Sequence, residues 1–447
     1  MQGPERVTFE QIQEVFDSFM LLKDRNIVRL TLAAIIGNQI PNRKPIWLLL
    51  VAPPSSGKTT VLNALIGLEV MGRNGEKVSP IHSISDITDK TFASGMMRND
   101  KEASLLYRIP PGGVLVFKDF TTLVSKREEE RRMVFGQLRE IYDGAFKKIF
   151  GTGEEVNWKG KIGAVGGVTE AIYKHLEGLS VMGDRFVLYQ IPQPNRKDAL
   201  RYALDQEEKG ITEESMMPVA RDLVQRYMQQ AYDALREQPV ILSPELKTEI
   251  IDVADFCTMV RSGVITNEYT SEIQFVPSPE MPFRMFHQML ALGSTFLLMQ
   301  RNDNPDKEPE LTDNERGLIY KMAYDSIPVT RRMALMHLAK YSQGVETAAL
   351  AMRMNYPTKV VLGWLETLNV LGVVKRVKKA GGFGNMWALK DEYRILMLKL
   401  QGVRATEDWL IEGDIEEDEA EAEWNKDKAN ESAMITEEEL DNMDGDF

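Results

Sequence analysis

The stretch at residues 46–59, IWLLLVAPPSSGKT, decides the predicted fold. Its first six residues are apolar, as in a strand of a parallel sheet that is buried on both faces. Its last eight residues match the pattern A-x-x-x-x-G-K-T, and residues 60–65 have the pattern of a helix. A strand, such a loop and a helix in succession form a nest of backbone N–H groups that binds phosphate. The stretch therefore predicts an α/β fold built around a phosphate-binding loop.

The loop residues have separate expected roles in binding ATP and Mg²⁺, the two cofactors that this pattern predicts. Lys58 would reach the β- and γ-phosphates, and the hydroxyl group of Thr59 would be a ligand of Mg²⁺. Ala52 stands where the pattern more often has glycine, a change that the pattern tolerates. The residues expected to contact the nucleotide are Ala52, Pro53, Pro54, Ser55, Ser56, Gly57, Lys58, Thr59 and Thr60.

Three more apolar runs of strand length follow, at residues 114–117, 162–168 and 186–191, with helical patterns between them. Strands that alternate with helices predict a mostly parallel sheet, in an ATPase domain at residues 1–193. A phosphate-binding loop also needs a carboxylate at the end of a neighbouring strand to hold the metal. Asp119, just after the run at residues 114–117, is placed for that role.

The residue that activates water is not identified by the sequence. A glutamate commonly follows the metal-binding aspartate, but Phe120 stands there instead. Glu140 and Asp143 are the substitutes that the sequence offers, and the alternative is that both are solvated helix residues.

Three further segments differ in composition. Residues 194–301 have helical patterns and no clear strand, and residues 311–396 contain helices followed by a short basic hairpin. Residues 405–447 hold 18 acidic residues and 2 lysines, a net charge of −16 that predicts a disordered tail. The remaining residues, 1–404, have a net charge of +3. This asymmetry is typical of proteins that act on nucleic acids, and the alternative is a tail that only aids solubility.

The cysteine count and the hydropathy pattern favour one cellular setting. Cys257 is the single cysteine of the 447 residues, which excludes an intrachain disulfide and a cysteine-based zinc site. No apolar run is long enough to cross a membrane. We therefore expect a cytoplasmic protein that does not bind a membrane.

With these residues in hand, the chain resembles the AAA+ superfamily of ATPases. Within it, the chain looks most like the branch that contains minichromosome-maintenance helicases and related phage and plasmid replication ATPases. The resemblance covers roughly residues 45–300 and begins with the Walker A loop and the Walker B residue Asp119. It implies ATP hydrolysis, an α-helical lid at residues 194–301 and assembly into a homo-oligomer, expected to be a hexamer.

A second feature of the resemblance is a lysine-rich hairpin. Residues 145–150 and 156–161 resemble the pre-sensor-1 β-hairpin of that branch, which grips DNA in a central pore. Lysines on paired strands beside Trp158 would hold phosphates by charge and a base by stacking. The lysines expected to bind DNA are Lys147, Lys148, Lys159 and Lys161. The alternative is a solvated hairpin with ordinary surface lysines.

Three more residues acquire expected catalytic roles from the resemblance. Residues 182–186 resemble an arginine-finger motif, so Arg185 would reach the γ-phosphate bound by a neighbouring subunit. The alternative is a local salt bridge. Residues 282–286 resemble the start of a sensor-2 helix, whose arginine, here Arg284, would contact the same phosphate. Thr169 is the sensor-1 candidate, although that branch usually has asparagine there.

The segment at residues 311–396 resembles a winged helix. In that fold the third helix enters the DNA major groove and the wing contacts phosphates. The third predicted helix, residues 359–369, displays Trp364 and Glu366 and has a lysine only at its start, so a protein-binding role stays open. The wing residues expected to contact phosphates are Lys375, Arg376, Lys378 and Lys379.

The acidic tail ends in DNMDGDF at residues 441–447. This tip is similar to the tail of bacterial single-stranded-DNA-binding proteins, which docks on replication partners. The resemblance implies a replication protein as a partner, or a tail that mimics DNA and covers a basic channel.

Three functions remain open from the sequence. The first is an ATP-driven helicase or translocase of a phage or mobile element, which acts on single-stranded or forked DNA. Arg185 favours it, because a trans-acting arginine finger needs a neighbouring subunit. The second is a replication initiator or helicase loader that uses ATP as a switch without unwinding, and Phe120 favours it. The third is a nucleotide-binding interaction protein that hydrolyses little ATP.

Overall fold

The first apolar stretch forms strand β1 (Trp47–Val51) inside a five-stranded, all-parallel sheet. Across the sheet the strands are β4 (Ile81–Ile84), β5 (Val114–Phe117), β8 (Gly163–Val168), β1 and β9 (Val187–Gln190). All neighbours pair in parallel, which confirms the predicted α/β fold with a mostly parallel sheet. The sequence did not predict β4, because its edge-strand sequence IHSI is not a continuous apolar run.

The structure is a computed structural model. It describes residues 6–72, 75–88, 90–93, 104–151, 155–174, 185–235, 240–266, 273–341, 343–378 and 385–402. Residues 1–400 form one unit. Lys379 and the predicted tail at residues 405–447 lie outside the described residues, as does the side chain of Lys378.

Both faces of the sheet are buried, as the continuous apolar strand sequence predicts. Leu48 and Leu50 of β1 point into one core, and the alternate residues of β1 point into a second core. In the first core, α2 (Asn26–Gly37) packs against the sheet and against α11 (Phe283–Asp303). In the second core, the apolar side of α6 (Glu128–Asp143) joins an aromatic cluster over the sheet.

The chain begins with a capped amphipathic helix, α1 (Phe9–Phe19). The Thr8 side chain accepts a hydrogen bond from the backbone N–H of Gln11, and the Gln11 side chain accepts one from the backbone N–H of Thr8. This capping box satisfies two donors that would otherwise have no partner at the helix start. The apolar side of α1 packs against α9 (Glu213–Ala234), so the N-terminal helix contacts the helical region that follows the sheet.

The connections between strands carry the short elements. The helix α3 (Lys58–Asn63) follows β1, and the ribbon of β2 (Val70–Met71) and β3 (Lys77–Val78) comes before β4. The helix α4 (Leu105–Arg108) comes before β5, and α5 (Thr121–Val124) follows it.

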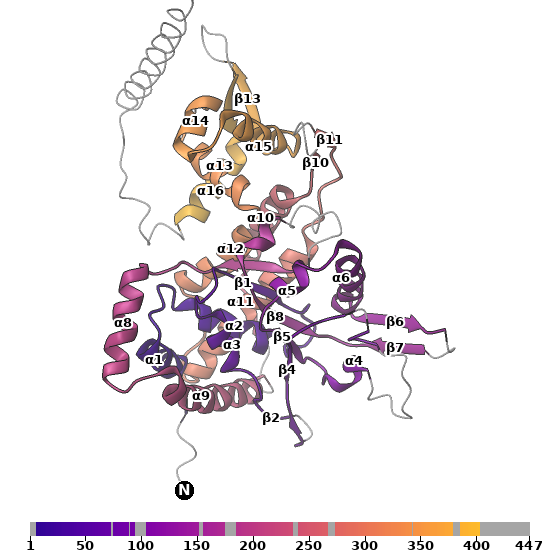
Figure 1. Ribbon diagram of the computed structural model, residues 1–447, viewed down its shortest axis with the longest axis vertical. Coiled ribbons are helices and arrows are strands. Elements are labelled where there is room, and N and C mark those ends of the chain that lie inside the picture. The colour runs from indigo at the N-terminus through magenta and orange to yellow at the C-terminus, as the bar shows by residue number, and fades with distance from the viewer. Residues whose placement is uncertain are drawn as a thin grey trace, which may run out of the picture. The chain divides into compact units, whose positions relative to one another are not determined.

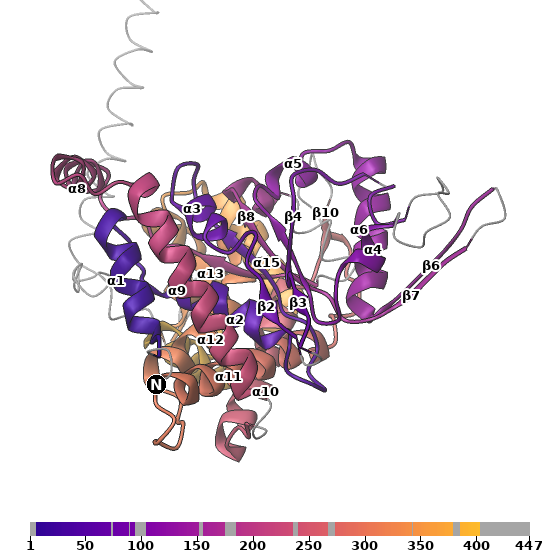
Figure 2. The same ribbon diagram turned by 90° about the horizontal axis from the view of Figure 1, so that it is seen from below.

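A two-stranded hairpin follows α6. Its strands, β6 (Ala145–Ile149) and β7 (Glu155–Lys159), pair antiparallel, as the sequence predicts. The hairpin projects from the sheet beyond α6, as Figure 1 and Figure 2 both show. The chain then returns to the sheet through β8, which ends in the short 3-10 helix η2 (Glu170–Lys174).

The region after β9 is mainly helical, as predicted. It contains α8 (Arg196–Glu208), α9, α10 (Pro244–Arg261) and α11. It also holds a short antiparallel pair, β10 (Ile265–Thr266) and β11 (Ile273–Phe275), in a region where the sequence predicted no strand. Strands of two and three residues are too short to produce a readable alternation of apolar and polar residues.

The helix α12 (Asp313–Asp325) covers the open edge of the sheet at β9. The Ser326 hydroxyl accepts the N–H of Leu188 at 2.9 Å, and the Asp325 carboxylate accepts the N–H of Gln190 at 2.8 Å. Lys321 Nζ donates to the Gln190 carbonyl at 2.7 Å. These side chains occupy the backbone groups of an edge strand that could otherwise pair with another chain.

The three helices and the hairpin predicted near the C-terminus are present, with two further elements, β12 and α16, that the sequence did not predict. In chain order the elements are α13 (Val329–Leu338), β12 (Val345–Glu346), α14 (Thr347–Met354), α15 (Thr358–Val370), β13 (Val374–Lys378), β14 (Asn385–Leu389) and α16 (Asp391–Gly402). The strand order is β12-β14-β13, and α13 packs against both α14 and α15.

Among the helices of the described residues, none combines the length and apolar character that a membrane crossing needs.

Candidate functional site

The loop between β1 and α3 has the tight conformation that its sequence predicts. Ser55 and Gly57 both have positive φ angles, of 60° and 81°. Gly57 precedes the first residue of α3, and a Cβ atom there would lie 2.3 Å from Met20 Cε. The left-handed backbone favours glycine at position 57, and any side chain there would also displace the end of Met20.

Lys58 folds back onto the loop that carries it. Its ammonium group donates to the carbonyl oxygens of Ala52 and Pro53, both at 2.7 Å, and to Ser56 Oγ at 3.0 Å. The residue is only 8% exposed, and burial lowers the pKa of Lys58, against the opposing charges of Asp119 and Glu170. A buried ammonium group held by loop carbonyls is positioned to exchange those partners for phosphate oxygens.

The end of β8 lies between the phosphate-binding loop and Asp119. A Cβ atom at Gly167 would lie 3.4 Å from Lys58 Cβ, so the stem of Lys58 crosses β8 at a glycine. The N–H of Ala52 donates to the Val168 carbonyl at 3.2 Å, and the N–H of Phe120 donates to the Gly167 carbonyl at 2.7 Å. The end of β8 is therefore hydrogen-bonded both to the start of the loop at Ala52 and to the segment that carries Asp119.

Asp119 and Thr169 are linked through Thr121. Asp119 Oδ1 accepts the N–H of Thr121 at 2.9 Å, and Thr121 Oγ1 accepts the N–H of Thr169 at 3.1 Å. The structure thus brings Lys58, Asp119 and Thr169 to the carboxyl edge of the sheet. The sensor-1 role of Thr169 stays a prediction, since its hydroxyl contact in this structure is with Thr121 at 3.4 Å.

Phe120 points away from this edge and into the second core. It is 1% exposed, and its ring packs 4.9 Å from Phe186 and 6.0 Å from Phe135, centroid to centroid. The side chain that follows Asp119 therefore points into an aromatic cluster.

Arg185 and Arg284 lie at the opposite edge of the sheet. Arg185 precedes β9, whose Val187 pairs with Leu48 at the amino end of β1. Arg185 is 8% exposed and forms an ion pair with Asp143, Nη2 to Oδ2, at 3.0 Å. The local salt bridge that the sequence left open is present. It also places Asp143 away from the Lys58 of the same chain.

Charged and polar side chains at the start of α11 and beside it surround Arg185. Burial, followed by the nearby charge of Arg284, lowers the pKa of Arg185. Arg284 forms an ion pair with Glu280 at 3.1 Å, and the buried Arg261 forms another with Glu280 at 2.9 Å. Gln288 of α11 donates to the Arg185 carbonyl at 3.0 Å. The two arginines that the resemblance assigned to one phosphate therefore lie near each other.

The hairpin presents its lysines and buries its aromatic residues. Lys147 forms an ion pair with Glu155 at 3.1 Å, and Lys148 Nζ lies 5.4 Å from the ring centroid of Phe150. Lys159 is exposed. Trp158 is only 7% exposed, so the expectation that it stacks on a base is wrong. Its indole packs against Gly160, where a Cβ atom would lie 2.5 Å from Trp158 Cζ2.

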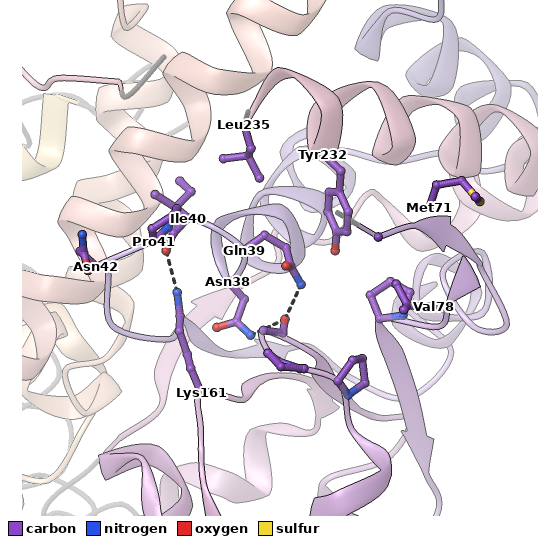
Figure 3. Close-up of a pocket in the computed structure, with 15 residues that line it drawn as sticks. Asn38, Gln39, Ile40, Pro41, Asn42, Met71, Val78, Lys161, Tyr232 and Leu235 are labelled. Carbon is purple, nitrogen blue, oxygen red and sulfur yellow. Dashed lines mark hydrogen bonds between the residues drawn. The ribbon is translucent and has the colours of Figure 1, made fainter. Parts of the chain in front are cut away.

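Lys161 lies apart from the other hairpin lysines, in a pocket of about 500 Å³ at the amino ends of β4, β5 and β8. Figure 3 shows Lys161 pointing toward Ile40, and Lys161 Nζ donates a hydrogen bond to the Ile40 carbonyl oxygen at 3.0 Å. Burial lowers the pKa of Lys161 to about 8. Asn38 lies on the same wall and donates to the Gly112 carbonyl at 2.7 Å.

Two basic residues of the C-terminal hairpin, Lys375 and Arg376, have acidic partners within the described residues. Arg376 pairs with Glu366 at 2.9 Å and lies over the Trp387 ring, 4.8 Å from its centroid. Lys375 pairs with Asp391 at 3.3 Å. Nearby, the ring of Tyr356 packs at the start of α15, 4.8 Å from the ring of Trp364, centroid to centroid. The DNA-binding roles of Lys375, Arg376, Lys378 and Lys379 stay predictions.

Several residues of the site were not identified from the sequence. Met20 covers Gly57, and Glu213 Oε2 accepts a hydrogen bond at 3.1 Å from Thr60 Oγ1, a residue that the sequence did identify, which ties α3 to α9. Gly167 and Glu170 lie at the end of β8. The signal for the last two was present as GGVTE after an apolar run, but a single sequence does not show which strand neighbours β1.

No protein-family model matches this sequence, and no curated protein is significantly similar to it.

Proposed function

We propose that this chain binds ATP with Mg²⁺ and hydrolyses it to drive movement on DNA, as an AAA+ helicase or translocase of a phage or mobile element. One observation carries the proposal. Lys58 and Asp119 lie at the same edge of a parallel sheet, in segments that follow the two strands flanking β8, and the end of β8 is hydrogen-bonded to both segments. Ligands of open α/β sheets bind at the carboxyl ends of the strands.

The residues present fit a magnesium ion. Thr59 is exposed in the first turn of α3 and offers a hydroxyl oxygen, and Asp119 offers a carboxylate whose Oδ1 is oriented by Thr121. Mg²⁺ prefers oxygen ligands and usually combines one or two protein oxygens with phosphate and water. Bound there, the ion would neutralise charge on the phosphates.

The chain's own residues bind and orient the nucleotide. The loop at residues 52–60 supplies N–H donors, and Lys58 exchanges its contacts with Ala52 and Pro53 for phosphate oxygens. The threonines at positions 121 and 169 keep the segment after β5 attached to the end of β8. The site is thereby organised before the phosphates arrive, which avoids a cost of rearrangement during reaction.

Arg185 supports assembly of several copies. A five-residue parallel strand spans roughly 16 Å, so an arginine at the amino edge does not reach phosphates at the carboxyl edge of its own sheet. Arg185 and Arg284 would act on the nucleotide of a neighbouring copy, where a cation stabilises the transition state. A ring, expected to be a hexamer, provides such a neighbour for every subunit.

The direct test is ATP hydrolysis measured with and without single-stranded DNA. We expect DNA to stimulate the wild-type rate, and Lys58→Ala to lower it by about 100-fold or more through lost phosphate contacts. Asp119→Asn should lose Mg²⁺-dependent hydrolysis. Lys77→Ala, at an exposed lysine of β3, is the matched control and should keep the wild-type rate. Undiminished DNA-stimulated hydrolysis by Lys58→Ala would contradict the proposal.

A second candidate function is a replication initiator or helicase loader that uses ATP as a switch. The burial of Phe120 favours it, because the position next to Asp119 supplies no catalytic base. Strand displacement on a forked duplex separates the two: a helicase unwinds the fork during ATP hydrolysis, and a loader leaves it paired.

A further inference from the structure

The proposed site lacks a base at the usual place, and its geometry restricts where one can be. The base has to lie at the carboxyl edge of the sheet, close to Lys58 and Asp119, with its carboxylate in solvent. Phe120 is buried in the second core, and Asp143 is paired with Arg185 at the amino edge. Glu140 lies one turn before the end of α6, the helix that ends at Asp143. The last turn of α6 packs against Trp47 at the amino end of β1, so Glu140 also lies toward the amino edge.

Glu170 meets these conditions. It follows β8, the strand that lies between β1 and β5, by two residues. The backbone of β8 is bonded to Ala52 on one side and to Phe120 on the other, so Glu170 emerges between the phosphate-binding loop and the metal-binding carboxylate. The helices α3 and α5, which follow β1 and β5, lie at this same edge of the sheet (Figure 2).

The environment of Glu170 also suits a proton acceptor. Its side chain is exposed, and within the described residues it makes no hydrogen bond or ion pair. Its negative charge acts on the ammonium group of Lys58, together with the charge of Asp119. The preceding residue is held by the hydrogen bond from its N–H to Thr121 Oγ1, which fixes the start of η2. A carboxylate on a fixed backbone, facing solvent, can hold a water molecule next to bound phosphate.

We propose that Glu170 is the catalytic base that activates water for ATP hydrolysis, an inference that rests on the proposed ATPase function. Glu170 accepts a proton from water while the water oxygen bonds to the γ-phosphorus. The bond from the γ-phosphorus to the β,γ-bridging oxygen breaks, and its electron pair leaves with ADP. The proton then passes to the released phosphate or to solvent, so ATP and water give ADP and phosphate. The proposed base therefore comes after β8, the strand next to β1, and not directly after Asp119.

The test is the variant Glu170→Gln, which keeps the size of the side chain but does not accept a proton. We expect kcat to fall about 100-fold or more, as for the loss of a general base, with KM for ATP unchanged. Binding of a fluorescent ATP analogue should stay within about twofold of wild type, because Lys58 and Asp119 are intact. Glu170→Asp should recover part of the rate, since it restores a carboxylate one methylene group shorter.

Glu140→Gln is the matched control, because it removes the competing exposed carboxylate on α6 and should leave the rate at the wild-type level. Thermal melting of each variant reports whether it is folded. Wild-type turnover by Glu170→Gln, while Lys58→Ala is inactive, would overturn the role of Glu170 and leave the ATPase proposal standing. Loss of analogue binding by Glu170→Gln would also overturn it, because the residue would then act in binding. A wild-type protein without ATPase activity would instead remove the proposed function itself.

Discussion

Gly57 and Gly167 determine where the side chain of Lys58 lies. Gly57 has a left-handed backbone below Met20, and Gly167 lets the stem of Lys58 cross the end of β8. A Cβ atom at Gly167 would also lie 3.2 Å from the Lys118 carbonyl, so a side chain there would crowd that carbonyl beside Lys58. The absence of two side chains thus leaves room for the loop and for the Lys58 side chain to lie as they do.

Phe120 and Glu170 lie in opposite environments around this site. Phe120 contributes its ring to an aromatic cluster with Phe117 and Phe186, and edge-to-face or tilted packing of this kind stabilises the core over β8. A carboxylate buried at that position would lose its hydration without gaining a partner. Glu170, in contrast, is exposed at the end of the neighbouring strand. Burial therefore distinguishes Phe120, whose ring belongs to the core, from Glu170, whose carboxylate faces solvent.

Lys161 makes stability depend on pH in a defined window. Its pKa falls from the ordinary 10.5 to about 8 on burial, so between these values the unfolded chain binds the proton and the folded chain does not. The free energy of unfolding should therefore rise with pH across this window. We expect wild type to gain stability relative to Lys161→Met between pH 8 and pH 10.5, measured by urea unfolding.

The control for Lys161 is Lys77→Met, at an exposed lysine whose ion pair with Glu69 spans 3.5 Å. The difference in free energy of unfolding between Lys77→Met and wild type should stay constant over the same pH range. A wild-type advantage over Lys161→Met that shrinks as pH rises would show that the lysine charge stabilises the fold, contrary to this expectation.

At the scale of elements, the hairpin of β6 and β7 separates its two faces by alternation. Phe146, Val156 and Trp158 are buried, while Lys147 and Lys159 point to the other side. A buried aromatic side holds the hairpin in place, and the charged side is left for a phosphate backbone. If the hairpin binds DNA, it does so by charge, because its tryptophan is enclosed.

We expect the triple change of Lys147, Lys148 and Lys159 to alanine to weaken binding of single-stranded DNA. The plot of log affinity against log salt should become less steep by up to roughly 2, because each phosphate contact with a single strand contributes about 0.7 to the slope. Fluorescence anisotropy over a salt series measures this. ATP hydrolysis without DNA should be unchanged.

The matched control replaces three exposed lysines elsewhere, Lys77, Lys197 and Lys209. An equal change of slope in both triple variants would mean that net charge, and not the hairpin, determines DNA affinity.

At the scale of the whole molecule, a buried charged network joins the sheet to the C-terminal helices. Arg332 at the start of α13 bonds Asp325 at 2.6 Å, Gln190 Oε1 at 2.8 Å and the Tyr173 hydroxyl at 3.2 Å. Asp325 also contacts Lys321. The network therefore connects η2, which carries Glu170, to the first helix of the C-terminal segment. Charges buried this completely are retained only when each has a partner.

Assembly makes a prediction about mixtures of variants. If Arg185 serves the nucleotide bound by a neighbouring copy, Lys58→Ala and Arg185→Ala should each be inactive alone. Mixing them should restore activity, because an Arg185→Ala subunit keeps Lys58 and can receive Arg185 from a Lys58→Ala neighbour. In a random equal mixture about a quarter of the interfaces are intact, which sets the recovered rate of ATP hydrolysis. The control mixes Lys58→Ala with Asp119→Asn, which share the same edge and should not complement.

No recovery in the first mixture, with co-assembly verified by size-exclusion chromatography and light scattering, would indicate that Arg185 serves its ion pair with Asp143 alone.

The sequence by itself determined the loop at residues 52–59 and four of the five strands of the sheet, including the strand before that loop. These features are local, because a continuous apolar run and a fixed spacing of Gly57 and Lys58 depend only on neighbouring residues. It also located Asp119, since the residue follows a recognisable buried strand. The short edge strand β4, the enclosure of Trp158 and the isolation of Lys161 were not predicted.

Only the tertiary structure decided which residues share an edge of the sheet. Strand order is a long-range property, so the sequence did not show that β8 lies between β1 and β5, or that Glu170 emerges beside Lys58. The same order placed Arg185 and Arg284 together at the far edge. The loop at residues 52–59 could be predicted from neighbouring residues, whereas the candidate base and the position of Arg185 at the far edge follow from packing, because distant segments meet only in the folded chain.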